Sequence, residues 1–322
     1  MTRELRVATA TEILSDTRHE SWVLKPFLVA GSGMMLYGRQ GIGKSTLAMQ
    51  LAAAFANGEE WLCFPTFAKG KTLWLQLDMP RAELRRLIVR SEKGKLFRNG
   101  TREQVMYANM TDGEHEAFDF NVFHDEDVQA LLRIVEEKRP ALLIVDTISD
   151  AYRLRAQREL NEQIRDVLKI LRTVVSRVGA VMVYLNHERK RSQQTVGDDK
   201  DAFLSAVAFE TFATASIQLT GSGKDEEQHF SLKFRKCRLD DPGFDKLELT
   251  KDSLGFFAPV FSASQAILTW PYSVPVSLRH TGGRDAVMDT IAAHLNFSRD
   301  ALRQAWHRLK REPEWAMPSV TP

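Results

Sequence analysis

Residues 34–54, MMLYGRQGIGKSTLAMQLAAA, contain the spacing G-x-x-x-x-G-K-[ST]. The apolar run before the glycines predicts a short buried strand, and the run after them predicts a helix. A loop between a strand and a helix N-terminus points several backbone N–H groups at one place, where a phosphate binds. In this spacing Lys44 is expected to reach the β- and γ-phosphates, and Ser45 to bind Mg²⁺. The predicted loop consists of Gly38, Arg39, Gln40, Gly41, Ile42, Gly43, Lys44, Ser45 and Thr46.

The alternative interpretation of this stretch is a chance match in a glycine-containing turn. The motif requires a strand before the loop and a helix after it, and both are predicted here. We therefore predict a phosphate-binding loop with ATP and Mg²⁺ as cofactors.

The composition limits the class of protein. The chain has 322 residues, 43% of them hydrophobic, which is enough for one large core and a small second domain. The net charge is +2, so contact with nucleic acid would depend on local basic patches. Cys63 and Cys237 have no metal-ligand spacing and favour a reducing, cytoplasmic location. We expect no membrane partner, because no apolar run reaches membrane-spanning length.

Apolar strands alternate with amphipathic helices from residue 34 to about residue 250. Strands are predicted at 71–78, 141–146 and 180–187, and helices at 80–90, 127–140 and 160–179. This alternation is typical of an α/β fold with a mainly parallel sheet. From 215 to 250, strand-like runs alternate with turn residues and predict antiparallel hairpins. The predicted divisions are an N-terminal arm at 1–30, an α/β domain at 31–252, a proline-containing linker at 253–283 and a helical segment at 284–322.

Three predicted strands end in polar residues, at what would be one edge of the sheet. Asp146 ends an apolar strand about one hundred residues after the loop, so it is expected to hold Mg²⁺ directly or through water. Asp78 is placed to activate the attacking water, or alternatively to cap the helix that begins at Pro80. His187 is placed to contact the γ-phosphate, or alternatively serves only the structure.

The combined pattern resembles the RecA-like hexameric helicase ATPases, most closely the RepA-type branch and next the DnaB-type replicative helicases. The resemblance covers about residues 20 to 250 and rests on LYGRQGIGKSTLAMQLA, LWLQLDMPRAEL, LLIVDTISD, MVYLNHERK and FRKCRLDDPG. It implies that Asp78, one methylene shorter than the family's catalytic Glu, activates water and that His187 senses the γ-phosphate. It also implies that Lys236 and Arg238 reach into the neighbouring subunit's nucleotide. The implied catalytic set is Lys44, Asp78, Asp146, His187, Lys236 and Arg238.

The same resemblance implies two basic segments that face the channel of a ring. The first, AYRLRAQREL, contains Arg153, Arg155 and Arg158, and the second, HERKRSQQTVGDDK, contains Arg189, Lys190 and Arg191. Such side chains would contact phosphates of single-stranded DNA without sequence preference. The alternative is that both segments are ordinary solvated charge runs, and Asp198 and Asp199 weaken the second.

The C-terminal segment predicts two helices separated by a short turn. Ile291 and Leu295 form an apolar face on the first helix, and Leu302 and Trp306 on the second, which Ser298 can cap. This pattern resembles a helix-turn-helix whose second helix offers Arg299, Arg303 and Gln304 to DNA. The alternative is a helical hairpin docked on the ATPase core.

By resemblance we expect an ATP-dependent, ring-forming replicative helicase of a mobile element that translocates on single-stranded DNA. The expected partners are single-stranded DNA, further copies of the chain in a ring, expected to be a hexamer, and a primase or initiator protein. One alternative is a RecA-like ATPase that loads or regulates other proteins without unwinding DNA. The other is a sequence-specific origin-binding protein that uses its C-terminal helices.

Overall fold

The computed structural model of the chain describes most of its length. The described residues are 9–15, 21–108, 120–152, 160–188, 209, 212–222, 229–240, 242, 244–268, 270 and 284–311. In this part of the chain, no helix is long and apolar enough to cross a membrane.

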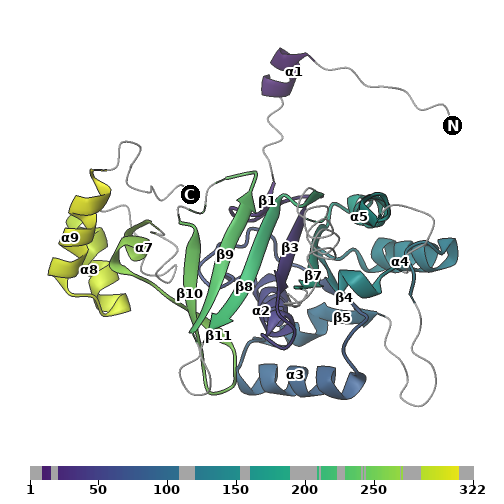
Figure 1. The fold of residues 1–322 in the computed structure, drawn as a ribbon, viewed down its shortest axis with the longest axis horizontal. Helices are drawn as coiled ribbons and strands as arrows, with labels where there is room; N and C mark the ends of the chain where they lie inside the picture. Colours follow the sequence, from purple (N-terminus) through teal and green to yellow (C-terminus); the bar gives the residue numbers. More distant parts are fainter. Residues whose placement is uncertain are drawn as a thin grey trace, which may run out of the picture.

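A nine-stranded sheet forms the centre of the molecule, in the order β11-β10-β9-β8-β3-β7-β6-β4-β5 (Figure 1). From β8 to β5 the neighbouring strands are parallel, and from β8 to β11 they are antiparallel. The predicted α/β fold, with a mainly parallel sheet and late antiparallel strands, is confirmed. The strands are β3 (Gly33–Gly38), β4 (Thr72–Gln76), β5 (Val105–Ala108), β6 (Leu142–Asp146), β7 (Val181–His187), β8 (Ala215–Ser222), β9 (His229–Cys237), β10 (Lys246–Lys251) and β11 (Phe257–Val260).

Helices cover both faces of the sheet. Buried side chains of α2 (Lys44–Asn57) and α3 (Arg81–Lys93) belong to the core on one face. Those of α4 (Asp125–Lys138) and α5 (Leu160–Ser176) belong to the core on the other face. The amphipathic helix predicted at 160–179 is confirmed as α5, since apolar side chains at helical spacing along it are buried against the sheet. This two-sided burial explains why β6 and β7 are apolar nearly throughout.

The end of the predicted N-terminal arm contributes to the core. After α1 (Ala10–Ser15), the strands β1 (Trp22–Leu24) and β2 (Leu28–Val29) form a small hairpin. Phe27 between them is fully buried, with its ring centroid 4.7 Å from that of Phe64 and 5.4 Å from that of Phe234. This hairpin therefore packs against strand β9.

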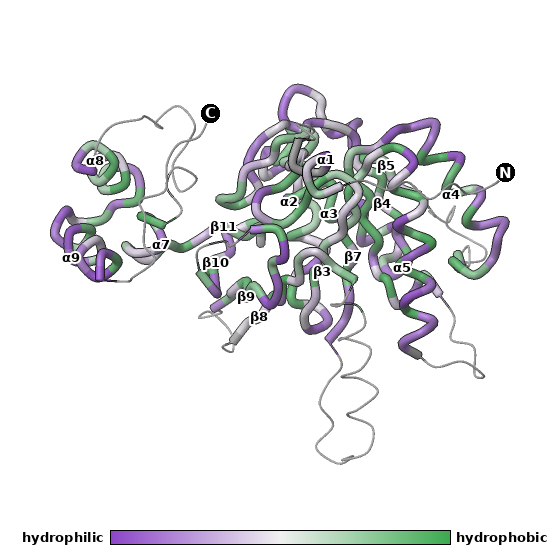
Figure 2. Tube along the Cα trace, turned by 90° about the horizontal axis from the view of Figure 1, so that it is seen from above, coloured by the Kyte–Doolittle hydropathy of each residue, from purple (hydrophilic) through white to green (hydrophobic). Residues whose placement is uncertain are grey.

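The interval 253–283, predicted as a linker, contains two elements within its described residues. These are β11, which pairs with β10, and α7 (Ala263–Leu268). Helix α7 packs with α8 (Arg284–Leu295) and α9 (Arg299–Leu309), the two predicted C-terminal helices, around a separate core that includes Trp270, Ile291 and Leu302. This three-helix unit lies beside the edge of the sheet, beyond β11 (Figures 1 and 2). Only residues 261 and 262 separate β11 from α7.

Candidate active site

The predicted strand ends meet at one edge of the sheet. Gly38 and His187 are direct neighbours in the register of β3 and β7. Asp146 ends β6, and its carbonyl accepts hydrogen bonds from the N–H groups of Leu77 (2.7 Å) and Asp78 (3.2 Å), just beyond β4. The fold thus brings together the ends of four strands that lie between residues 38 and 187 of the sequence.

The loop between β3 and α2 depends on glycine at two positions. A Cβ at Gly38 would lie 2.3 Å from the carbonyl oxygen of Leu219 in β8, so only glycine allows this close approach. Gly43, the N-cap of α2, has φ 113°, a left-handed conformation that favours glycine. Among the described residues, no side chain caps α2, and the N–H groups of a helix's first turn are where an anion binds best.

Lys44 begins a chain of contacts that runs across the site. Its ammonium donates to the carbonyls of Gly38 (3.1 Å) and Arg39 (3.0 Å) and lies 3.0 Å from Nδ1 of His187. Because a lysine ammonium only donates, Nδ1 is the acceptor, and the ring proton lies on Nε2. That nitrogen is 3.2 Å from Oδ2 of Asp78 and donates to it. The orientation of Asp78 therefore depends on Lys44 through His187.

Asp78 is not a helix cap. Pro80 occupies the N-cap position of α3, and no side chain caps that helix. The alternative of a structural cap is therefore wrong, and Asp78 instead faces His187 at the loop. Its side chain is 46% exposed, so it remains accessible to water.

Asp146 is a buried carboxylate beside the loop. It accepts a hydrogen bond from Ser45, but its Oδ2 has no hydrogen-bond partner among the described residues. The pKa of Asp146 is raised to about 6, chiefly by burial and also by the nearby Asp78, although Ser45, Lys44 and His187 act to lower it. Burial also lowers the pKa of Lys44, while Asp146 and Asp78 raise it. A cation next to Asp146 would offset the cost of this buried charge.

These features fit ATP with Mg²⁺. Hydroxyl and carboxylate oxygens are the ligands that Mg²⁺ prefers, and Ser45 and the unpartnered Oδ2 of Asp146 supply both. The glycine loop and the uncapped start of α2 offer backbone N–H groups to phosphates. When bound, the metal ion would neutralise negative charge on the phosphates.

A pocket of about 270 Å³ lies between α2 and α3 and adjoins the phosphate loop. Thr46 on α2 accepts a hydrogen bond from Nη2 of Arg90 (2.9 Å), which crosses from α3. This role of Arg90 could not be predicted from the sequence, because α3 has the pattern of an ordinary amphipathic helix. The pocket is lined by Ser45, Thr46, Met79, Glu83, Arg86, Leu87 and Arg90.

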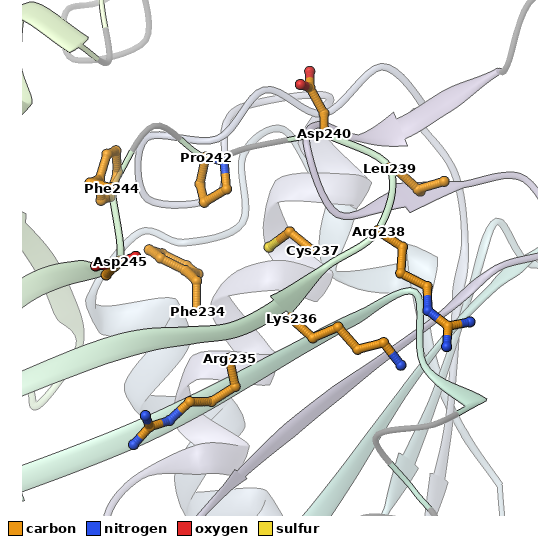
Figure 3. A pocket seen from close by; sticks show the side chains of 10 residues that line it. All are labelled: Phe234, Arg235, Lys236, Cys237, Arg238, Leu239, Asp240, Pro242, Phe244 and Asp245. Carbon is orange, nitrogen blue, oxygen red and sulfur yellow. The ribbon is translucent and has the colours of Figure 1, made fainter. Parts of the chain in front are cut away.

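Lys236 and Arg238 lie at the opposite end of the strands from the phosphate loop, at the side of the sheet where β3 begins. The N–H of Arg238 donates to the carbonyl of Thr214 (2.9 Å), and the N–H of Thr214 donates to that of Gly33 (2.8 Å), where β3 begins. The phosphate loop follows the other end of β3. That end is about 17 Å from Gly33, because a strand of this length spans about that distance at the usual rise per residue. Lys236, Arg238 and Arg235 help to line a pocket of about 440 Å³. The side chains of Lys236 and Arg238 extend to the same side, whereas that of Arg235 points away from them (Figure 3). Arg238 is exposed and cannot reach the loop of its own subunit.

The predicted DNA-contacting residues are only partly described. Arg153, Arg155, Arg158, Arg189, Lys190 and Arg191 lie outside the described residues. On α9, Arg299 forms an ion pair with Asp289 of α8, and Arg303 lies 3.4 Å from Asp300. Gln304 is exposed, and Ser298 caps the helix by accepting from the N–H of Ala301 (3.1 Å). The predicted cap is therefore confirmed, while the DNA-binding role of α9 stays a prediction.

Comparison with known proteins identifies the family. A family model described as an AAA domain, AAA_25, matches residues 2–193, more than half of the chain. The chain belongs to this AAA-domain family. The family match, the phosphate-binding loop and the mainly parallel sheet together identify a P-loop ATPase.

Two solved structures resemble this chain at low sequence identity. One is a KaiC-like protein from the hyperthermophilic archaeon Pyrococcus horikoshii OT3, with 18% identity and a TM-score of 0.47 over 74% of this chain and 94% of that chain. The other is the flagellar accessory protein FlaH from Methanocaldococcus jannaschii, with 12% identity and a TM-score of 0.49 over 72% of this chain and 90% of that chain. No curated protein gives a significant match.

Replacing Asp78 with Asn should preserve nucleotide binding and lower the rate of ATP hydrolysis about 100-fold or more. The reason is that an amide cannot accept the proton of the attacking water. Single-turnover hydrolysis and ATP affinity of the Asp78→Asn variant would measure the two effects separately. Hydrolysis at the wild-type rate would place the water-activating group elsewhere.

Replacing Asp146 with Asn should stabilise the nucleotide-free AAA domain at pH 8. Folding raises the pKa of Asp146 from 3.8 to about 6, so the cost of burying its charge is absent below pH 4 and complete above pH 6. The Asn variant should gain up to about 3 kcal/mol at pH 8 and about half of that at pH 5. Urea unfolding at both pH values, without Mg²⁺, would measure the gain. The largely exposed Asp300 serves as the control, and an equal gain at both pH values would contradict the prediction.

Proposed function

We propose that this ATPase assembles head to tail into a ring and translocates on single-stranded DNA as a replicative helicase. The observation that carries the proposal is the separation of the phosphate loop from Lys236 and Arg238, at opposite edges of one sheet. Cations at the second edge can complete only the site of another copy. Such an interface joins two different surfaces, and it closes into a ring when the rotation permits.

Within the site, each side chain has a proposed part in hydrolysis. Lys44 would leave its loop carbonyls and His187 for the phosphates, and this would free Asp78 to orient and deprotonate water. His187 would then report the state of the γ-phosphate to the chain that follows β7. The nucleoside would lie in the pocket between α2 and α3, since that pocket begins at Ser45 and Thr46.

The proposed DNA contacts begin at the same edge of the sheet. The segments 153–159 and 189–208 follow strands β6 and β7, whose ends carry Asp146 and His187. A change of nucleotide could therefore be passed to both segments over a short path. Their arginines and lysines would bind DNA phosphates, so the affinity should fall steeply with salt.

The test is ATP turnover with and without single-stranded DNA, combined with unwinding of a forked duplex. We expect single strands to stimulate turnover and ATP to drive strand separation, with a non-hydrolysable analogue supporting assembly only. An ATP turnover rate that is the same with and without single-stranded DNA would overturn the translocation proposal and leave the ATPase assignment intact. Stimulation without unwinding would indicate the loader or regulator instead.

The three-helix unit supports a second candidate, a sequence-specific DNA-binding protein. Its separate core and the capped α9 form a compact unit with exposed Arg303 and Gln304. Binding to one duplex site, lost when both residues are replaced with Ala, would favour this candidate. Binding without sequence preference would favour the helicase.

A further inference from the structure

Lys251 lies behind the phosphate loop, at the end of strand β10. Its ammonium donates to the carbonyl of Ile42 in the loop (3.3 Å). The same nitrogen lies 4.1 Å from the ring centroid of Phe230 and 4.9 Å from that of Phe257. A cation between two aromatic rings is favourably placed, because the faces of the rings carry partial negative charge.

The hairpin formed by β10 and β11 is hydrogen-bonded to helix α2. Gln50 of α2 forms two hydrogen bonds with the backbone of Phe257: its Nε2 donates to the carbonyl (2.7 Å), and its Oε1 accepts from the N–H (2.9 Å). Phe257 is the direct partner of Lys251 in the strand register. The same phenylalanine ring would lie 2.9 Å from a Cβ at Gly43. The position of Lys251 is thus set by the helix that the phosphate loop precedes.

The hydrogen bond to Ile42 also fixes the orientation of one loop peptide. A trans peptide is planar, so the carbonyl of Ile42 and the N–H of Gly43 point in opposite directions. With the carbonyl held toward Lys251, the N–H of Gly43 points away from the hairpin. A positive charge at the carbonyl also polarises the peptide and makes this N–H a stronger donor.

We infer that Lys251 is a positioning residue for nucleotide binding, which orients the Ile42–Gly43 peptide so that the Gly43 N–H faces the phosphates. Lys251 acts through the backbone of the loop and does not contact the nucleotide. Burial and the nearby Arg90 lower the pKa of Lys251, because both disfavour its charged form; the inference therefore rests on the hydrogen bond to Ile42 and on the two ring contacts. The inference depends on nucleotide binding at the loop and is independent of DNA translocation.

The test compares ATP·Mg²⁺ affinity and steady-state turnover of the full chain, without DNA, in three variants. Lys251→Met keeps a flexible apolar side chain between the two rings, and Lys251→Arg keeps the positive charge. Lys246→Met is the matched control, because Lys246 lies on the same strand and is exposed. We expect Lys251→Met to weaken ATP binding about tenfold or more and to raise KM more than it lowers kcat, because the N–H bonds phosphate before and during hydrolysis. Lys251→Arg should restore most of the affinity, and Lys246→Met should resemble the wild type.

The stability of the nucleotide-free protein separates positioning from packing. Lys251→Met should unfold at a urea concentration equal to or above that of the wild type, because a partly buried charge is removed. Wild-type affinity in Lys251→Met would overturn the inference. Equal losses of affinity in the Met and Arg variants, accompanied by lower unfolding midpoints, would overturn it too, because packing alone would then explain both.

Discussion

Lys44→Ala is expected to lower ATP turnover by at least about 1,000-fold while the protein stays folded. The reason is that Lys44 belongs to the loop and not to the apolar core: its ammonium donates to Gly38 and Arg39 and contacts His187. With nucleotide bound, this cation would stabilise the charge that develops on the phosphates, and its removal loses an interaction made in the transition state. The measurement is ATP turnover together with the unfolding midpoint of the nucleotide-free protein.

The matched control for Lys44→Ala is Lys93→Ala, since Lys93 is exposed at the end of α3. This control should retain wild-type turnover. Normal hydrolysis by a folded Lys44→Ala protein would refute the role of the loop. Loss of turnover with a large fall in the unfolding midpoint would mean that the variant reports on folding instead.

Arg238→Ala is expected to bind ATP normally and to lose turnover in the assembled state by about 1,000-fold, the usual effect of an arginine that acts across an interface. Mixing it with Lys44→Ala should restore part of the activity. Mixed assemblies contain interfaces in which an intact loop faces an intact arginine, and neither variant forms them alone. Turnover as a function of the mixing ratio is the measurement, with subunit exchange shown by labelled chains.

Arg235→Ala provides the control for this experiment. Arg235 lies on the same strand, but its side chain points away from Lys236 and Arg238 and donates to Gln218 (Figure 3). It should keep turnover close to that of the wild type. If mixing Arg238→Ala with Lys44→Ala gives no gain although subunits exchange, Arg238 has no role in the neighbouring site.

The long elements could be predicted from the sequence because each carries a complete apolar pattern. Helix α5 spans 17 residues with one buried face, and β6 is apolar up to Asp146. Strands β1, β2 and β5 have two to four residues, too few to show a period, and form only because other segments pair with them. Strand β11 resembled a linker because of Pro259, which an edge strand tolerates since one side needs no donor.

The candidate site was predictable where it follows from strand ends. Asp78, Asp146 and His187 lie together because parallel strands end at one edge of the sheet, a rule that needs no strand order. Lys251 and Gln50 could not be found this way. Their contacts with the loop arise because the chain adds β8 beside β3 and then folds back through β9 and β10, and no local pattern encodes that order. Arg90 was missed for a related reason, since its partner Thr46 lies 44 residues earlier.

The phosphate loop and Arg238 lie at opposite ends of the strands, and this placement determines how many complete ATPase sites an assembly contains. If Arg238 completes the site of the neighbouring copy, as proposed, a closed ring of any size has one complete site per copy. An open chain always has one fewer site than copies, since each end presents an unfilled half. Turnover per copy would then be half-maximal in a dimer, rise with the length of an open chain and reach its full value only on closure. Enzymatic rate divided by assembly size thus becomes a direct measure of whether the ring is shut.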